Sequence, residues 1–278
     1  MDERGKTLRV QRGRGNRQQV MIKSLEITTG IGCSNACAFC PQVAVVRNYP
    51  AHHPKQFTPD YFEKCLSTVP IDCRVHFSGF AEAMLNETFP EMWVLAHSRG
   101  HAIHLYSTLV GLREAWLPTL VKYAPEYTRI HVPDLDGFQY PDEQWIALHE
   151  LFRQTALPAH YMAMTPLISP AVNAYLHEFG IKVKPKQMRS RGGNVKIVPQ
   201  VYRHGRIRCA EDRWHRNTLL PNGDVLLCCE DYGMEVRLGN LLKQSYAEIY
   251  EAAEGYRAIT DPPSDFICRR CYWSEEVR

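Results

Sequence analysis

Residues 33–40 read Cys-Ser-Asn-Ala-Cys-Ala-Phe-Cys, a C-x-x-x-C-x-x-C array that comes shortly after an apolar, strand-like run, Val20–Thr28. Thiolates are the soft ligands that iron–sulfur clusters select, and a short loop with three of them can bind three corners of a cubane. The missing fourth cysteine leaves one iron open to another ligand, as catalytic metal sites keep a vacant position. Zinc is the alternative, but it usually takes four ligands in two C-x-x-C-like pairs, so the array favours an open iron–sulfur cluster.

Short apolar runs alternate with helix-like stretches from about residue 20 to residue 184. Besides the run before the array, the expected strands are Cys73–Ser78, Ala102–Ser107, Thr128–Val132, Pro158–Ala163 and Ile181–Lys184. Thr58-Pro59 and Ser169-Pro170 have the form of an N-cap followed by proline at the first helical position. Gly100 and Gly180 stand where helix ends favour a left-handed residue. This alternation predicts parallel βα units, and hence an α/β layer or barrel.

The pattern changes after residue 185. Arg189–Asn194 has the composition of a loop, and Pro221-Asn-Gly-Asp224 between Asn217–Leu220 and Val225–Cys228 is a strong hairpin signal. A short helix is expected over Lys243–Glu254. We therefore divide the chain into a basic extension (1–19), a main α/β domain (20–190) and a smaller α+β domain (191–278).

Composition and charge limit the classes of function. The 278-residue chain is 45% hydrophobic and has a formal net charge of +3, of which residues 1–19 contribute +4. A basic extension either contacts nucleic acid or is simply solvated. Solvation is favoured, because residues 20–278 have a formal net charge of −1 and show no basic patch of the kind that binds nucleic acid. No apolar run of eighteen residues and no secretory signal is present, so we expect no membrane partner and a cytoplasmic location.

A second set of cysteines lies in the C-terminal part. It consists of Cys209, Cys228, Cys268 and Cys271. Four thiolates, two of them in a terminal C-x-x-C, predict a closed site that holds either an iron–sulfur cluster or zinc. Cys229 directly follows Cys228, and neighbouring strand residues face opposite sides, so both cannot easily bind one cluster. Cys229 could be the ligand instead, a buried spectator or a hydrogen-atom donor.

The first array, the aromatic Phe39 before its last cysteine, and its place after the first strand resemble the radical S-adenosylmethionine (SAM) superfamily. Together with the second set, the chain is similar to the subgroup with SPASM or truncated "twitch" domains, and to twitch-bearing aminocyclitol dehydrogenases. The resemblance implies a partial (β/α)6 barrel with a small C-terminal domain. It also implies SAM and two [4Fe–4S] clusters as cofactors, one catalytic and one auxiliary.

The resemblance also implies roles for single residues. The segment that ends the second strand resembles the family's Gly-Gly-Glu stretch, which faces the SAM amino group, although Ala81 replaces the second glycine. The cofactor-binding residues expected from the family are Phe39, Ser78, Gly79, Glu82, Ser107 and Asp134. Arg191, in a Ser-Arg-Gly-Gly-Asn stretch like one that precedes the auxiliary cluster in related enzymes, is expected to contact substrate or SAM.

Three hypotheses for function follow. The first is an oxidoreductase that removes hydrogen from a small polar substrate, such as a sugar or cyclitol alcohol, with the auxiliary cluster as electron acceptor. The second is radical modification of a peptide, by epimerisation or cross-linking, with Cys229 as hydrogen-atom donor. The third is a zinc-binding module without catalysis. Both enzymatic hypotheses require an external electron donor such as flavodoxin or ferredoxin.

Overall fold

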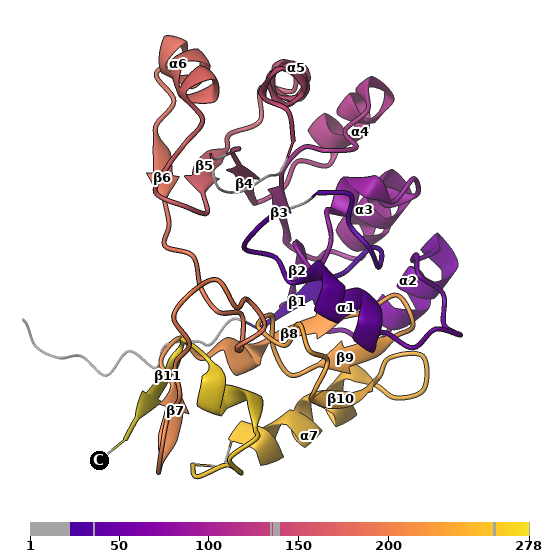
Figure 1. The fold of residues 1–278 in the computed structure, drawn as a ribbon. Coiled ribbons are helices and arrows are strands. Elements are labelled where there is room, and N and C mark those ends of the chain that lie inside the picture. The colour runs from indigo at the N-terminus through magenta and orange to yellow at the C-terminus, as the bar shows by residue number, and fades with distance from the viewer. Residues whose placement is uncertain (1–22, 36, 134, 136–139, 258–259, 278) are drawn as a thin grey trace, which may run out of the picture.

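The computed structural model describes residues 23–35, 37–133, 135, 140–257 and 260–277. Its centre is one sheet of nine strands in the order β10-β9-β8-β1-β2-β3-β4-β5-β6 (Figure 1). The first six strands are β1 (Ser24–Ile27), β2 (Arg74–Phe77), β3 (Ile103–Ser107), β4 (Tyr127–His131), β5 (His160–Ala163) and β6 (Val183–Pro185). They are parallel neighbours in chain order. The partial six-stranded α/β barrel predicted from the sequence is therefore confirmed.

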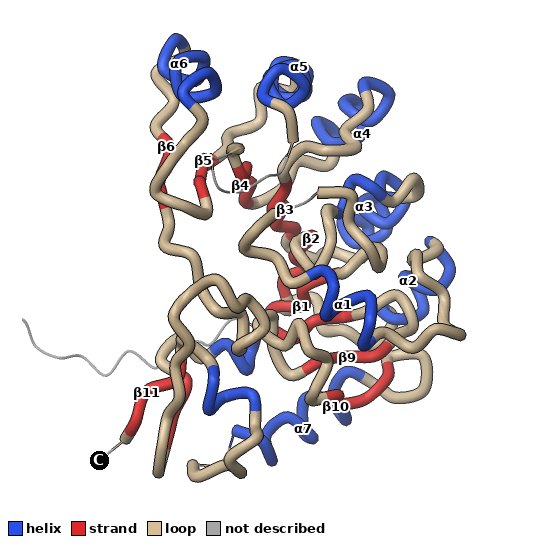
Figure 2. Tube along the Cα trace, viewed as in Figure 1, coloured by secondary structure: helices blue, strands red, loops and turns tan. Residues whose placement is uncertain are grey.

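Helices cover the outer side of this sheet (Figure 2). They are α2 (Pro59–Leu66), α3 (Phe89–Ser98), α4 (Leu117–Lys122), α5 (Asp142–Arg153) and α6 (Pro170–Glu178). The remaining helix, α1 (Gln42–Asn48), packs through Val45 in a second, smaller core with Leu226 and Tyr232. The predicted N-caps are confirmed: the side chains of Thr58 and Ser169 accept hydrogen bonds from the backbone amides of Tyr61 and Val172. Gly100 and Gly180 have φ values of 87° and 65°, the left-handed conformation expected after a helix.

The strands of the barrel have two chemically different faces. Leu25 and Ile27 of β1, with Val75 and Phe77 of β2, are fully buried in the main hydrophobic core together with side chains of α2 and α3. The alternate residues Glu26, His76, Tyr106, Arg129 and Met162 point the other way and line a cavity. Since side chains alternate along a strand, this polar row is the inner face of the barrel.

The C-terminal part extends the same sheet. Its strands β8 (Arg216–Leu219), β9 (Asp224–Leu226) and β10 (Arg237–Asn240) join that sheet. The strands β7 (Ile207–Cys209) and β11 (Ser274–Glu276) form a separate two-stranded sheet, and α7 spans Tyr246–Arg257. The predicted hairpin is present as β8–β9, and β8 lies parallel to β1. The sheet thus continues across residue 190, and the division into domains at that point stays a prediction.

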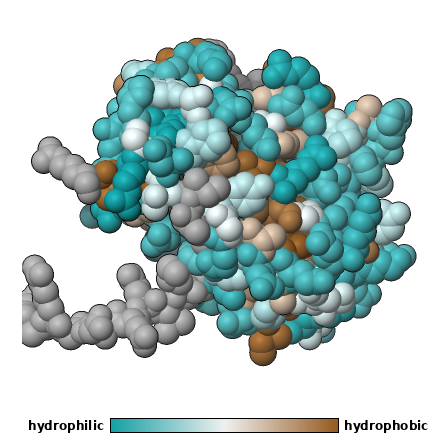
Figure 3. All heavy atoms as spheres, turned by 90° about the horizontal axis from the view of Figure 1, so that it is seen from below, coloured by the Kyte–Doolittle hydropathy of each residue, from teal (hydrophilic) through white to brown (hydrophobic). Residues whose placement is uncertain are grey.

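The outer surface is mostly polar. In the space-filling view, hydrophilic residues cover most of the visible face, with hydrophobic atoms gathered near its centre (Figure 3). Among the described residues, no helix combines the length and the apolar character needed to span a bilayer.

Candidate active site

The cavity on the inner face of the barrel brings most of the predicted site residues together. Its volume is about 670 Å³. The predicted residues that line it are Cys33, Cys37, Phe39, Cys40, Ser78, Gly79, Glu82, Ser107, Arg191 and Cys229. They come from the ends of β1, β2 and β3 and from two later loops, so only the fold unites them. Asp134 lies outside the described residues, and its role is not addressed by the structure.

The first cysteine array lies in the loop between β1 and α1. Gln42, at the start of α1, holds this loop: its Oε1 accepts the amide of Cys33 at 3.3 Å and its Nε2 donates to Cys40 Sγ at 3.2 Å. The same Nε2 donates to the carbonyl oxygen of Phe80. Burial raises the pKa of Cys33 and of Cys40. As free thiols both are protonated, and a bound metal would stabilise the thiolate.

The end of β2 is anchored by Glu82. Its carboxylate accepts hydrogen bonds from Ser107 Oγ at 2.7 Å, from the amide and hydroxyl of Thr108 at 2.6 and 2.7 Å, and from the amide of Met84 at 3.3 Å. Burial raises its pKa, an effect that these bonds oppose. Glu82 therefore ties the end of β2 to the end of β3, and its expected contact with SAM stays a prediction.

Gly79 is required by packing. A Cβ atom there would lie 2.5 Å from Thr28 Cα and 2.6 Å from the carbonyl oxygen of Ile27. Its amide donates to that carbonyl at 3.1 Å. A glycine is therefore needed where the chain after β2 crosses the end of β1, whatever the cavity binds.

Arg191 lies in a loop with unusual backbone geometry. Its φ is 49°, and those of Gly192 and Gly193 are 61° and 85°, so three successive residues are left-handed. The turn aims the guanidinium into the cavity, where Nη1 lies 3.2 Å from Glu230 Oε1. Arg213 Nη1 lies 3.7 Å from the same oxygen. A buried carboxylate thus holds two arginines at this end of the cavity.

The second cysteine set is assembled by the C-terminal strands. Pairing of β7 with β11 places Cys209 opposite Ser274, three residues after Cys271. The thiol of Cys228 is close enough to those of Cys268 and Cys271 for their charges to raise its pKa. Cys209 acts in the same way on Cys268 and Cys271. Burial is the largest cause, and it raises the pKa of Cys271 to about 12.

Cys229 has different surroundings from Cys228, although its charge also acts on that neighbour. It lines the cavity, whereas Cys228 does not, and its Sγ accepts a hydrogen bond from Arg213 Nη1 at 3.2 Å. The charges that act on it are those of Glu26, Arg213 and Glu230. The structure therefore places Cys228 near Cys268 and Cys271 and Cys229 in the cavity lining, and which of the two binds a cluster stays a prediction.

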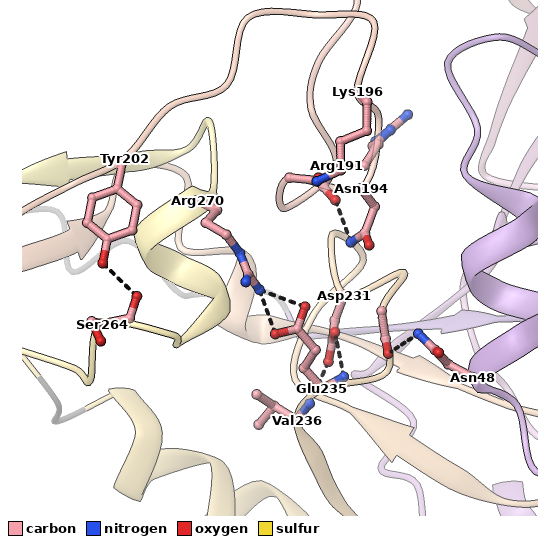
Figure 4. A network of polar contacts seen from close by, with 12 residues as sticks. Asn48, Arg191, Asn194, Lys196, Tyr202, Asp231, Glu235, Val236, Ser264 and Arg270 are labelled. Atoms are coloured by element: carbon pink, nitrogen blue, oxygen red, sulfur yellow. Dashed lines mark hydrogen bonds and ion pairs between the residues drawn. The ribbon is translucent and has the colours of Figure 1, made fainter.

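The segment after these cysteines is braced by polar contacts (Figure 4). Asp231 accepts the amides of Glu235 and Val236, each at 2.9 Å. Arg270, in the C-x-x-C, pairs with both carboxylate oxygens of Glu235 at 2.7 and 2.6 Å. Asn48, at the end of α1, donates to the carbonyl oxygen of Gly233 at 2.9 Å. The two cysteine regions are thus attached to each other.

None of the ten cysteines forms a disulfide in the described part of the chain. Within the described ranges no group of three or more histidine, cysteine or acidic side chains is arranged to hold a metal ion.

Several cavity residues were not predicted from the sequence. They are Glu26, His76, Tyr106, Arg129, Lys186, Arg189, Arg213, Arg216, Glu230 and Trp273. The alternation Ser-Leu-Glu-Ile in β1 is a signal for one of them, because a carboxylate between two core residues must face the inside of the barrel. Burial raises the pKa of Glu26, and the neighbouring Arg213, Ser78 and Cys229 oppose that rise.

Comparisons with known proteins agree with this architecture. Residues 209–272 match the SPASM family, an iron–sulfur cluster-binding domain. A search of curated protein sequences finds no match.

Three solved structures share the fold at low sequence identity. BtrN in complex with AdoMet and 2-DOIA is 14% identical over 87% of this chain and 87% of its own, with a TM-score of 0.58. Native anSMEcpe with bound AdoMet is 13% identical over 90% of this chain and 86% of its own, with a TM-score of 0.62. Streptococcus suis SuiB bound to precursor peptide SuiA is 12% identical over 89% of this chain and 69% of its own, with a TM-score of 0.63. Residues 209–272 therefore match the SPASM iron–sulfur cluster-binding domain, and the whole chain shares its fold with these three AdoMet- or peptide-bound structures.

Proposed function

We propose that this protein is a radical SAM enzyme with two [4Fe–4S] clusters. The observation that carries the proposal is one cavity lined by the three-cysteine loop, by the segment after β2 and by Arg191 and Cys229. Cys33, Cys37 and Cys40 would hold the catalytic cluster and leave one iron for SAM. Cys209, Cys228, Cys268 and Cys271 would hold the auxiliary cluster. When bound, these groups supply a 5′-deoxyadenosyl radical that removes hydrogen from substrate, and an acceptor for a second electron.

Within this class we infer oxidation of a small polar substrate, such as a sugar or cyclitol alcohol. The likeness to BtrN, solved with AdoMet and 2-DOIA, supports this choice. Oxidation of an alcohol also releases the hydroxyl proton, which the cavity must accept. Glu26 faces the cavity with a raised pKa, the property of an effective general base. Arg213 beside it favours the ionised carboxylate, which is the form that accepts the proton.

Peptide modification is the second candidate, favoured by the position of Cys229. Its thiol lines the cavity apart from the other C-terminal cysteines, as a hydrogen-atom donor to a substrate radical would require. Likeness to SuiB, solved with its precursor peptide SuiA, adds support. Loss of turnover in Cys229→Ala with SAM cleavage retained would favour this candidate over alcohol oxidation.

The decisive experiment is anaerobic reconstitution with iron and sulfide, followed by incubation with SAM and a reducing donor such as flavodoxin or ferredoxin. We expect 5′-deoxyadenosine and methionine to be released. The matched control is the Cys33/Cys37/Cys40→Ala triple variant, which keeps the C-terminal set and should release neither. A reduced, iron-loaded wild-type protein that leaves SAM intact would overturn the proposal.

A further inference from the structure

Positive charge gathers at the β6 edge of the barrel. Lys182, Lys184 and Lys186 alternate along β6 and its flanks, and with Arg129 of β4 they line a second cavity of about 430 Å³. We call these four residues the basic end. The second cavity shares Arg129, Met162 and Lys186 with the main cavity, so the two are neighbouring spaces. None of the described residues that line the second cavity is acidic.

Arg129 is held in place by aromatic rings. Its guanidinium donates to the hydroxyl of Tyr127 and lies 5.1 Å from the centroid of that ring. It also lies 5.4 Å from the ring of Tyr106 on the next strand. Stacked guanidinium groups lose little freedom when they bind an anion, because their orientation is already set.

The lysines face one another without neutralising partners. Burial lowers the pKa of Lys186, and the like charges of Lys184, Arg129 and Arg189 lower it further, with only a small opposing effect from Glu211. In the part of the chain that the structure describes, no carboxylate forms an ion pair with any member of the basic end. By contrast, Arg191 and Arg213 share Glu230 on the opposite side.

Lysines on an edge strand often serve only to prevent pairing with another chain. That explanation does not cover Arg129, which lies on β4, an interior strand between β3 and β5. It also does not explain why the lysines and this arginine line the same cavity. Like charges that line one cavity repel one another, and an anionic ligand would relieve that repulsion.

We propose that the basic end binds an anionic group of the substrate, a phosphate or a carboxylate. This inference rests on the proposed function and narrows its substrate class from polar to negatively charged molecules. Lysine and arginine form charge-assisted hydrogen bonds with both kinds of anion, and a phosphate makes use of more cations than one carboxylate does. The anion would hold one end of the substrate near Arg129 and Lys186, with the remainder in the main cavity.

The test is a calorimetric titration of the anaerobically reconstituted protein with inorganic phosphate and, separately, with acetate. We expect saturable binding of at least one anion. The anion that binds more tightly shows whether the anionic group of the substrate is a phosphate or a carboxylate. Lys184→Met/Lys186→Met should weaken that binding at least tenfold. The matched control is Lys122→Met/Lys243→Met, which removes the same charge from two exposed lysines elsewhere and should bind as the wild type does.

Two results would overturn the inference: neither anion binds to the wild type, or the two double variants bind equally well. Release of 5′-deoxyadenosine is measured on the same preparations. Because anion binding needs no SAM cleavage, failure of that release with binding intact would count against the proposed function alone. Intact release without anion binding would count against the basic end alone.

Discussion

The ring of Phe80 packs against the ring of Tyr232, with centroids 4.3 Å apart and planes inclined by 33°. Phe80 follows β2, and its carbonyl oxygen accepts a hydrogen bond from Gln42 Nε2. The same nitrogen donates a second hydrogen bond to Cys40 Sγ. Tyr232 follows the Cys228–Cys229 pair by a few residues. This contact therefore joins the two cysteine regions through a small core of their own, separate from the main one.

Truncation of this contact should destabilise the protein as a whole. Phe80 is 2% exposed, so Phe80→Ala should lower the free energy of unfolding by about 3–5 kcal/mol. Tyr232→Phe keeps the ring and should change it by less than about 1 kcal/mol. Anaerobic urea denaturation measures both variants. A loss below about 1 kcal/mol for Phe80→Ala would show that the two regions do not depend on this contact.

Iron content should separate the two cysteine sets. Wild-type protein should hold about eight irons, because each cubane contains four. The Cys33/Cys37/Cys40→Ala variant should hold about four, and so should Cys209→Ala/Cys268→Ala. Iron and sulfide analysis after anaerobic reconstitution provides the measurement. An unchanged iron content in either variant would contradict the assignment of that set.

The adjacent cysteines 228 and 229 should behave differently. Cys228→Ala removes a thiol beside Cys268 and Cys271, so we expect it to lower the iron content toward about four. Cys229→Ala removes a thiol bonded to Arg213, and we expect about eight irons to remain. Each variant is the control for the other, since burial and sequence position are nearly the same. The opposite pattern would make Cys229 the ligand.

Glycine at position 79 should be irreplaceable. In Gly79→Ala the new methyl group would meet the backbone of Ile27 and Thr28, so we expect a loss of about 1–3 kcal/mol in unfolding free energy. Gly255, within α7, has no atom near the position of an added Cβ. Gly255→Ala should therefore stabilise the protein by about 0.5–1 kcal/mol. Thermal and urea unfolding of Gly79→Ala and Gly255→Ala measure this difference. Equal changes in unfolding free energy for the two variants would contradict the prediction.

His149 should make stability depend on pH. Burial, aided by Arg153, lowers its pKa from 6.5 to about 4, and its ring nitrogens bond the hydroxyls of Tyr161 and Tyr175. The unfolded chain therefore takes up the proton first as pH falls, and stability is lost below pH 6.5. Between pH 7 and pH 5 this loss should be about 2 kcal/mol.

The control for this effect is His149→Gln, which cannot titrate. We expect the difference in unfolding free energy between wild type and variant to shrink as the pH falls from 7 to 5. Parallel curves for the two proteins would show that His149 does not carry the dependence.

Much of the fold was predictable because its signals are local. Alternation of apolar runs with capped helices indicated the six parallel strands, and each lies within a few residues of its expected place. The caps at Thr58 and Ser169 depend only on the few residues that follow them. The two cysteine sets were also visible, since ligand type and spacing are properties of short segments.

The sequence by itself determined the six parallel strands, the helix caps, the C-terminal hairpin and the cysteine sets. Tertiary structure alone decided that β8 lies beside β1, that Cys228 rather than Cys229 lies with the C-terminal thiols, and that Glu26 meets Arg213. It also brought Arg129 to the lysines of β6. These relations depend on strand order and loop closure between residues far apart in the chain, and no local pattern encodes them.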